Sequence, residues 1–356
     1  MYINYALLIN PGHNRVYFES SLSLSLAEFG IVAAKMSVAI DEAVITPIAG
    51  IEYLTFTAAD TLGAADIKIL SDLSFAYALF RMEGADSGND TALTLNPIAK
   101  TRTDYIDESM GRILKYSGKT NEIFTRMLIN IAACSTDLPE KPRLLDPVAG
   151  KGTTLYEGLI KGYDVYGIEI SEGVVNEVYH FVRRFLENAR YKFELKSLKI
   201  SGPDKSFRAQ RHTFKTAATK EAYKNKDTRT LEIIAGSALY ADKYYKAGFF
   251  DMIVGDLPYG IQHGNVTRKK MPTPTRHPGE LLSACLPAWL AVLRPGGVIA
   301  LSWNTHVCPR AQMEEIFMQH DVKLLNEGAY AGLSHRVDQA IMRDVVVWRK
   351  EEITKK

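Results

Sequence analysis

The tetrapeptide Asp256-Leu257-Pro258-Tyr259 holds the residue types that most clearly suggest chemistry. It follows FFDMIVG, an apolar run typical of a buried strand. Because Pro258 lacks an N–H and fixes its own φ, the Asp256 carboxylate and the carbonyl before Pro258 can point into one pocket. Two converging acceptors suit an amino group, which offers two hydrogens, and the Tyr259 ring offers a face on which a base can stack. These residues predict a pocket for an amino group on a planar ring.

A second stretch, LLDPVAGKGTT, has the pattern of a ligand-binding turn. Its apolar strand ends at Asp146, and Gly150 and Gly152 follow in a turn where the backbone can approach a ligand closely. The next strand, YDVYGIEI, ends with Glu169. An acidic side chain there can accept hydrogen bonds from both hydroxyls of a ribose. The pattern therefore predicts a site for a nucleoside.

Two other nucleotide-binding motifs share some of these residues. A phosphate-binding P-loop needs a first glycine where Leu145 stands, and a Ser or Thr directly after Lys151, where Gly152 stands. That motif fails. A dinucleotide fingerprint needs a third glycine, but Thr153, Thr154 and Leu155 follow Gly152. The dinucleotide reading is weakened and stays an alternative.

The elements that must position these residues alternate between strand and helix patterns from residue 143 onward. Such alternation predicts a parallel sheet covered by helices on both faces, with ligands at the carboxyl ends of the strands. A helix predicted over residues 121–133, capped at Thr120 or Asn121, opens this domain. Residues 191–230 interrupt the alternation as a basic insertion, with eleven Lys and Arg against four acids.

The length of 356 residues suggests a second domain. Residues 1–97 combine strand-like runs, YALLI and RVYF, with an apolar segment, SLSLSLAEFGIVAAKM, that could form a helix. A Gly, Asp, Ser and Asn cluster marks a turn or linker over residues 84–97. We therefore expect a small N-terminal α/β domain over 1–97 and a catalytic domain over 105–356.

Three motifs together, DPVAGKGTT, GIEIS and DLPYG, resemble the class I, Rossmann-like methyltransferases, and specifically the THUMP-associated guanine-N2 methyltransferases of tRNA. The resemblance covers roughly residues 105–350 and implies an α/β fold with a central, mainly parallel sheet. LRPGG at 293–297 is similar to a turn that precedes a late strand in such enzymes. Ser237 stands where an Asp often contacts the adenine, and the N-terminal domain shows no THUMP pattern.

The resemblance implies S-adenosylmethionine as the cofactor and the motif at 256–259 as the receptor of the target amine. The implied cofactor-binding residues are Asp146, Pro147, Ala149, Gly150, Gly152, Thr153, Glu169, Ile170, Ser237, Ala238 and Asp256. The implied catalytic residues are Asp256, Leu257, Pro258 and Tyr259. The expected product is N2-methylguanine, with adenine-N6 methylation of DNA or RNA as the alternative.

Charge is divided unevenly along the chain. Residues 1–100 carry five Lys and Arg against eleven Asp and Glu, so the net charge of +2 hides a basic remainder. A polyanion would be drawn to that remainder, and RNA, with tRNA favoured, is the expected partner. The basic insertion at 191–230 and the loop after the tetrapeptide are the candidates for contacts with the RNA backbone, and four cations of the loop would contact phosphates beside a flipped or unpaired base. They are Arg268, Lys269, Lys270 and Arg276.

Other classes of protein fit the sequence less well. Cys134, Cys285 and Cys308 form no C-x-x-C pair, which argues against a zinc site or a disulfide framework. The opening apolar run is short and meets Pro11 and Gly12, so we expect no signal peptide or membrane span and a cytoplasmic location. Glutamine methylation in a protein would usually use N-P-P-Y, and the Asp at position 256 counts against that activity. A non-catalytic, cofactor-holding RNA-binding subunit would show damaged motifs, and both motifs are intact.

Overall fold

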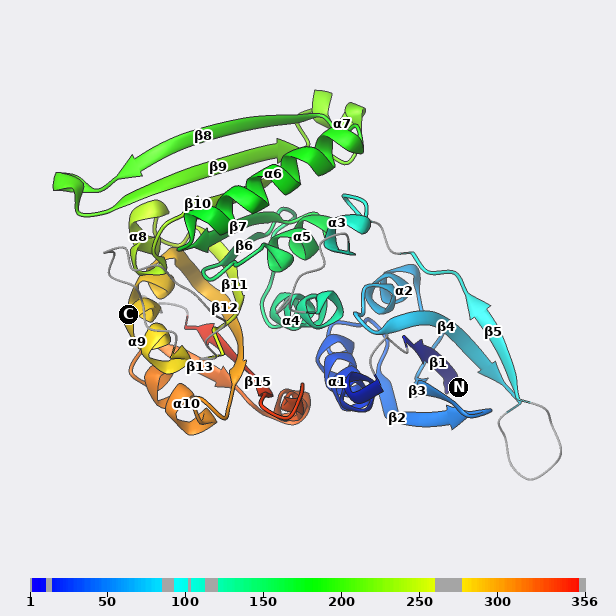
Figure 1. Ribbon diagram of the computed structural model, residues 1–356. Coiled ribbons are helices and arrows are strands. Elements are labelled where there is room, and N and C mark those ends of the chain that lie inside the picture. The colour runs from blue at the N-terminus through cyan, green and yellow to red at the C-terminus, as the bar shows by residue number, and fades with distance from the viewer. Residues whose placement is uncertain are drawn as a thin grey trace, which may run out of the picture. The chain divides into compact units, whose positions relative to one another are not determined.

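The computed structural model describes residues 2–10, 15–84, 93–101, 104–112, 121–259 and 277–351, with only the backbone described for 15–20, 42 and 204. The chain forms two compact units (Figure 1). The first contains residues 1–103 and 326–340, and the second contains 104–325 and 341–356. The sequence patterns did not predict that residues 326–340, late in the chain, belong to the first unit.

The first unit is an antiparallel sheet in the order β2-β3-β1-β4-β5. Its elements in chain order are β1 (Ile3–Ile9), α1 (Arg15–Ala33), β2 (Ile40–Ile48), β3 (Ile51–Ala58), α2 (Ala64–Ser71), β4 (Ala76–Glu83), β5 (Thr94–Ile98), the 3-10 helix η3 (Gly328–Gly332) and β14 (His335–Arg336). The first six follow the split βαβ arrangement of ferredoxin-like folds, and β5 extends one edge. The side chains of Tyr5, Phe29 and Phe56 meet in its core.

The second unit is built on a larger sheet in the order β13-β15-β12-β11-β6-β7-β10-β9-β8. Strands β12, β11, β6, β7 and β10 run parallel, and the strands outside them pair antiparallel. The strands are β6 (Arg143–Asp146), β7 (Asp164–Glu169), β8 (Phe193–Ser201), β9 (Arg208–Thr216), β10 (Arg229–Ala235), β11 (Phe250–Asp256), β12 (Leu293–Asn304), β13 (Val322–Leu325) and β15 (Met342–Lys350).

Helices cover both faces of this sheet. They are α3 (Ser109–Arg112), α4 (Glu122–Cys134), α5 (Thr153–Ile160), α6 (Glu172–Asn188), η1 (Pro203–Lys205), α7 (Lys220–Lys224), η2 (Ala238–Tyr240), α8 (Ala241–Tyr244), α9 (Pro278–Val292) and α10 (Arg310–Met318). Ile253 and Ile299 share a buried cluster with Trp289 of α9. Their strand neighbours point to the opposite face, where α4 contacts β11 and β12. This confirms the predicted fold class, an α/β protein with a central, mainly parallel sheet.

The sheet order reverses between β6 and β11. From β6 the chain runs outward through β7 and β10, and it then returns to place β11 on the other side of β6. Such a switch point leaves a crevice at the carboxyl ends of the two central strands, where ligands bind in open α/β sheets. Asp146 and Asp256 are the last residues of those two strands. The fold therefore brings the two predicted motifs to one edge of the sheet.

Three local expectations change in the structure. RVYF, expected as a strand, lies in α1, because a short apolar run reads equally well as part of a longer helix. LRPGG at 293–297, expected as a turn, lies within β12, whose register against β11 shifts at this point. The basic insertion at 191–230 contains a regular hairpin, β8 and β9, that extends the sheet beyond β10.

Candidate active site

The turn after β6 holds the first group of predicted cofactor residues. Asp146 is 3% exposed, and its Oδ1 accepts a hydrogen bond from the Val148 backbone N–H at 3.0 Å. Gly152 caps α5 with φ +87°, a conformation that L side chains rarely adopt, and an added Cβ would lie 3.0 Å from the Tyr156 ring. Pro147 and Ala149 are buried, and Thr153 begins α5. The segment is a tight strand-to-helix turn that needs glycine.

Burial changes the acid-base behaviour of Asp146. Removal from water raises the pKa of its carboxyl to about 7, against hydrogen bonds from Thr154 and Val148 that lower it. The negative charges of Asp256 and Glu169 raise this pKa further. The Asp256 and Glu169 carboxylates are therefore close enough to Asp146 to disfavour its ionised form.

This shift predicts how stability depends on pH. Between about pH 4 and pH 7 the folded protein holds a proton on Asp146 that the unfolded chain releases, so the free energy of unfolding should fall as pH rises through this window. Asp146→Asn removes that titration and should flatten the fall. Denaturant unfolding of both proteins at pH 5, 6, 7 and 8 measures it. Parallel curves of unfolding free energy against pH for parent and variant would contradict the assignment of this pH dependence to Asp146.

Glu169 joins two turns at this edge. Its Oε2 accepts the Gly150 backbone N–H at 3.1 Å, and its Oε1 accepts the Ser171 backbone N–H at 2.8 Å. An ionised carboxylate has about four acceptor positions, so each oxygen keeps capacity for another donor. Burial raises the pKa of Glu169, and these backbone hydrogen bonds oppose the rise. The carboxylate is held in one orientation at the end of β7.

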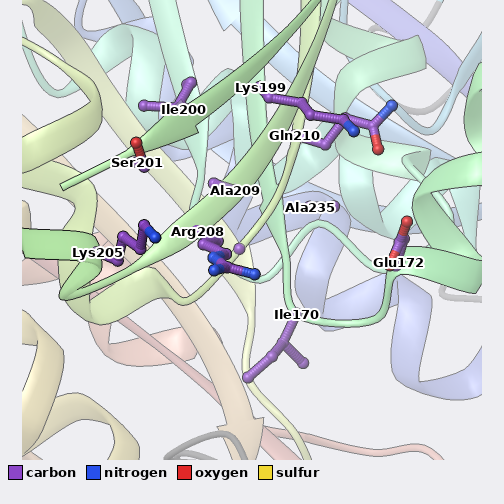
Figure 2. A pocket seen from close by; sticks show the side chains of 11 residues that line it. Ile170, Glu172, Lys199, Ile200, Ser201, Lys205, Arg208, Ala209, Gln210 and Ala235 are labelled. Atoms are coloured by element: carbon purple, nitrogen blue, oxygen red, sulfur yellow. The ribbon is translucent and has the colours of Figure 1, made fainter.

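A cavity of about 600 Å³ opens between the residues that follow β7, the end of β10 and the β8–β9 hairpin (Figure 2). Ile170 and Glu172 line it from the loop between β7 and α6, Ala235 and Gly236 from the end of β10, and the β8–β9 hairpin from the far side. Ile170 is 38% exposed, which leaves an apolar surface next to the Glu169 carboxylate. The cavity thus has an apolar surface at Ile170, the residue that directly follows Glu169.

Ser237 and Ala238 follow the end of β10 directly. The Gly236 N–H donates to the Glu169 backbone carbonyl at 2.9 Å, which joins the ends of β10 and β7. The Ser237 hydroxyl accepts from the Leu239 N–H at 3.4 Å and caps η2, while the Ala238 carbonyl accepts from the indole of Trp289. The predicted cofactor residues therefore lie along the adjoining ends of β11, β6, β7 and β10.

The tetrapeptide at the end of β11 forms a hydrogen-bonded cluster. The Tyr259 hydroxyl lies 2.7 Å from Oδ1 and 2.8 Å from Oδ2 of Asp256, and the Ser302 hydroxyl donates to Oδ1 at 2.6 Å. Leu257 is 1% exposed, and its N–H donates to the Ser302 carbonyl. Burial, followed by the Asp256 charge, raises the pKa of Tyr259 well above its ordinary value. The phenol therefore stays protonated and acts as a donor.

Arg343 completes the cluster from β15. This 4% exposed residue donates from Nε to the Tyr259 oxygen at 2.6 Å, and its Nη2 lies 3.9 Å from Asp256 Oδ2. Its guanidinium stands over the Phe124 ring at 4.2 Å from the centroid. The sequence patterns missed both Ser302 and Arg343. A polar Ser near the end of an apolar strand and an Arg two residues before the run VVVW were the available signals.

The cations expected beside the substrate base, Arg268, Lys269, Lys270 and Arg276, lie outside the described residues. Within the described ranges, no group of three or more His, Cys, Asp or Glu side chains is arranged to hold a metal ion. No helix in the described part of the chain is both long and apolar enough to span a membrane.

Fold and site together define an α/β protein whose two predicted motifs lie at the carboxyl ends of the strands beside the switch point. No protein-family model and no curated protein matches the chain. Among solved structures, the 16S rRNA N2 G1207 methyltransferase of T. thermophilus, crystallised with AdoMet and guanosine, matches at 16% identity and TM-score 0.31, over 61% of this chain and 37% of its own. TrmN from Thermus thermophilus matches at 13% identity and TM-score 0.44, over 98% and 99%. An rRNA methylase from Streptococcus thermophilus matches at 12% and 0.33, over 60% and 90%.

Proposed function

We propose that the chain is an S-adenosylmethionine-dependent RNA methyltransferase that forms N2-methylguanine, with tRNA as the favoured substrate. The observation that carries the proposal is the position of Asp256. Its carboxylate ends β11 at the switch point, on the edge where Glu169 and the glycine turn end the neighbouring strands. The side chain is 19% exposed, so it keeps access to the crevice.

The residues of the crevice fit an adenosine-containing cofactor. The exposed apolar surface of Ile170 suits one face of an adenine, and the free acceptor positions on Glu169 suit the two ribose hydroxyls. The positive-φ turn at Gly150 and Gly152 lets the backbone approach the remainder of the molecule. When bound, S-adenosylmethionine supplies an electrophilic methyl group on a sulfonium.

Asp256 would orient the amine. A substrate amino group can take over the acceptor positions that the Tyr259 hydroxyl holds on both carboxylate oxygens, while the Ser302 hydroxyl keeps Oδ1 in place. The amine nitrogen of guanine is a poor nucleophile because its lone pair is conjugated with the ring. Holding both of its hydrogens aims that lone pair, so catalysis would come from positioning and electrostatics. Asp256 also provides an acceptor for the proton that the nitrogen releases.

The preference for guanine over adenine rests on the resemblance of Asp256-Leu257-Pro258-Tyr259 to the guanine-N2 enzymes. We expect the full chain, incubated with methyl-labelled S-adenosylmethionine and RNA from a strain lacking the gene, to put its label in N2-methylguanosine. Digestion to nucleosides and mass spectrometry identify the product, with total tRNA and rRNA as separate substrates. Label in N6-methyladenosine would overturn the choice of guanine, and label only in protein would overturn the RNA substrate.

A further inference from the structure

The β8–β9 hairpin reaches the ligand-binding edge of the sheet. Strand β9 pairs antiparallel with β10, and the last pair joins Gln210 to Ala235, the end of β10. Strands β8 and β9 continue past that point to the pair Ser201 and Arg208. The turn of the hairpin, residues 201–208, therefore projects beyond the carboxyl end of β10, at the edge where ligands bind in such sheets.

Aromatic packing fixes this turn to the body of the unit. Phe207 is 9% exposed and stacks on Tyr240, with ring centroids 5.0 Å apart, while its contact with Tyr244 is edge-on at 5.5 Å. The Gly202 N–H donates to the Phe207 carbonyl at 3.1 Å and closes the turn. The position of the turn is thus set by buried side chains.

Three exposed cations of the hairpin line the cavity at the end of β10 (Figure 2). Lys199 and Arg208 extend from the paired strands and Lys205 from the turn. Among the described residues, no carboxylate lies within ion-pair distance of these three side chains, although Glu172 lines the same cavity.

Two other cations of the hairpin form ion pairs. Lys196 lies 2.9 Å from Glu194, and Arg211 lies 3.2 Å from Glu232. Lys192 and Lys215, at the other end of the hairpin, likewise have no ion pair among the described side chains, so the three cations at the turn are distinguished by their position at the cavity. S-adenosylmethionine carries no phosphate, so this charge exceeds what the proposed cofactor needs.

We infer that the hairpin turn, through Lys199, Lys205 and Arg208, binds phosphates of the substrate RNA backbone where the strand passes the nucleoside end of the crevice. This inference rests on the proposed function. Cations that neutralise phosphates release counterions, which makes binding depend on salt. The fixed turn would hold these cations in place before the RNA arrives, which limits the ordering cost of binding.

The test replaces the three cations by Gln, as Lys199→Gln, Lys205→Gln and Arg208→Gln in one full-length protein. Gln keeps a long polar side chain, and at Lys205, with φ +59°, it exchanges one non-glycine residue for another. The control replaces three exposed cations away from the turn: Lys192→Gln, Lys196→Gln and Lys215→Gln. Both variants lose the same charge.

Binding of unmodified tRNA transcripts is measured across a range of salt concentrations. The turn variant should lower the slope of log affinity against log salt by about 2, since each lost contact with single-stranded RNA is worth about 0.7. The control should keep a slope close to that of the parent, and both should keep their S-adenosylmethionine affinity. A turn variant with the parental slope, in a preparation that still methylates RNA, would overturn the assignment of the turn to RNA binding and leave the proposed function standing.

Two other outcomes separate the alternatives. A parent protein that binds S-adenosylmethionine but neither binds nor methylates RNA contradicts the proposed function itself. If the cations instead hold a small phosphorylated ligand, ATP should bind the parent, bind the turn variant much more weakly, and leave the RNA slope of both proteins equal. That result would also overturn the RNA assignment of the turn.

Discussion

Asp256→Asn should reduce methyl transfer by about 10²–10³-fold, the size of effect seen when one preorganised hydrogen-bonding group is removed from an active site. The amide keeps the shape of the side chain but replaces one acceptor oxygen by an NH₂ donor. Oδ1 already accepts from Ser302, and the Tyr259 hydroxyl lies within 2.8 Å of both oxygens. The variant therefore has one acceptor fewer for the two hydrogens of the amine.

Single-turnover methyl transfer and calorimetric binding of S-adenosylmethionine separate chemistry from cofactor affinity. Turnover should fall while cofactor affinity stays nearly unchanged. Asp227→Asn makes the same substitution at an exposed residue before β10, at the opposite edge of the sheet, and should behave as the parent. Near-parental turnover in Asp256→Asn would make the Asp256 carboxylate structural and remove the mechanism proposed above.

The parts of the fold that sequence predicted are those with local signals. The apolar strands β6, β7 and β11 are buried on both faces of the sheet, so each reads as a short apolar run ended by a polar residue. The helix predicted over 121–133 is α4, and Asn121 caps it by accepting the Ile123 N–H. Each signal lies within a few residues of the structure that it predicts.

The β8–β9 hairpin was not predicted because it lacks such local signals. Strand β8 is mostly exposed, with Leu198 58% exposed, so burial imposes no regular apolar alternation on it. Its pairing with β9 comes from backbone hydrogen bonds, which hydrophobic periodicity does not record. The high charge of residues 191–230 then reads as an irregular insertion, although the segment forms two regular strands.

The residues that contact Asp256 could not be predicted from the sequence and became visible only in the folded chain. Ser302 lies opposite Asp256 on β12, the strand beside β11. Arg343 lies on β15, which pairs antiparallel with β12. Neither residue is near the tetrapeptide in sequence. Only the strand order brings an arginine, a tyrosine and a carboxylate together, so motif spacing could name Asp256 and Tyr259 but not the residues that orient them.

Glu169→Ala should weaken S-adenosylmethionine binding by about 10- to 150-fold, because hydrogen bonds to a charged group are commonly worth about 1.5–3 kcal/mol. Two effects of the substitution both lower the affinity for the cofactor. The ribose would lose its carboxylate acceptor, and the Gly150 and Ser171 N–H groups would lose the side chain that ties their turns together. Calorimetry gives the affinity, and denaturant unfolding without cofactor reports the second effect separately.

Glu187→Ala is the matched control, since it removes the same charge from an exposed position on α6, where Glu187 pairs with Arg183. It should leave cofactor affinity unchanged. If Glu169→Ala loses affinity while its cofactor-free stability stays close to that of the control, the carboxylate acts directly on the ligand. Parental affinity in Glu169→Ala, or tight binding of a nicotinamide dinucleotide in place of S-adenosylmethionine, would contradict the cofactor assignment while leaving the switch-point crevice as the binding site.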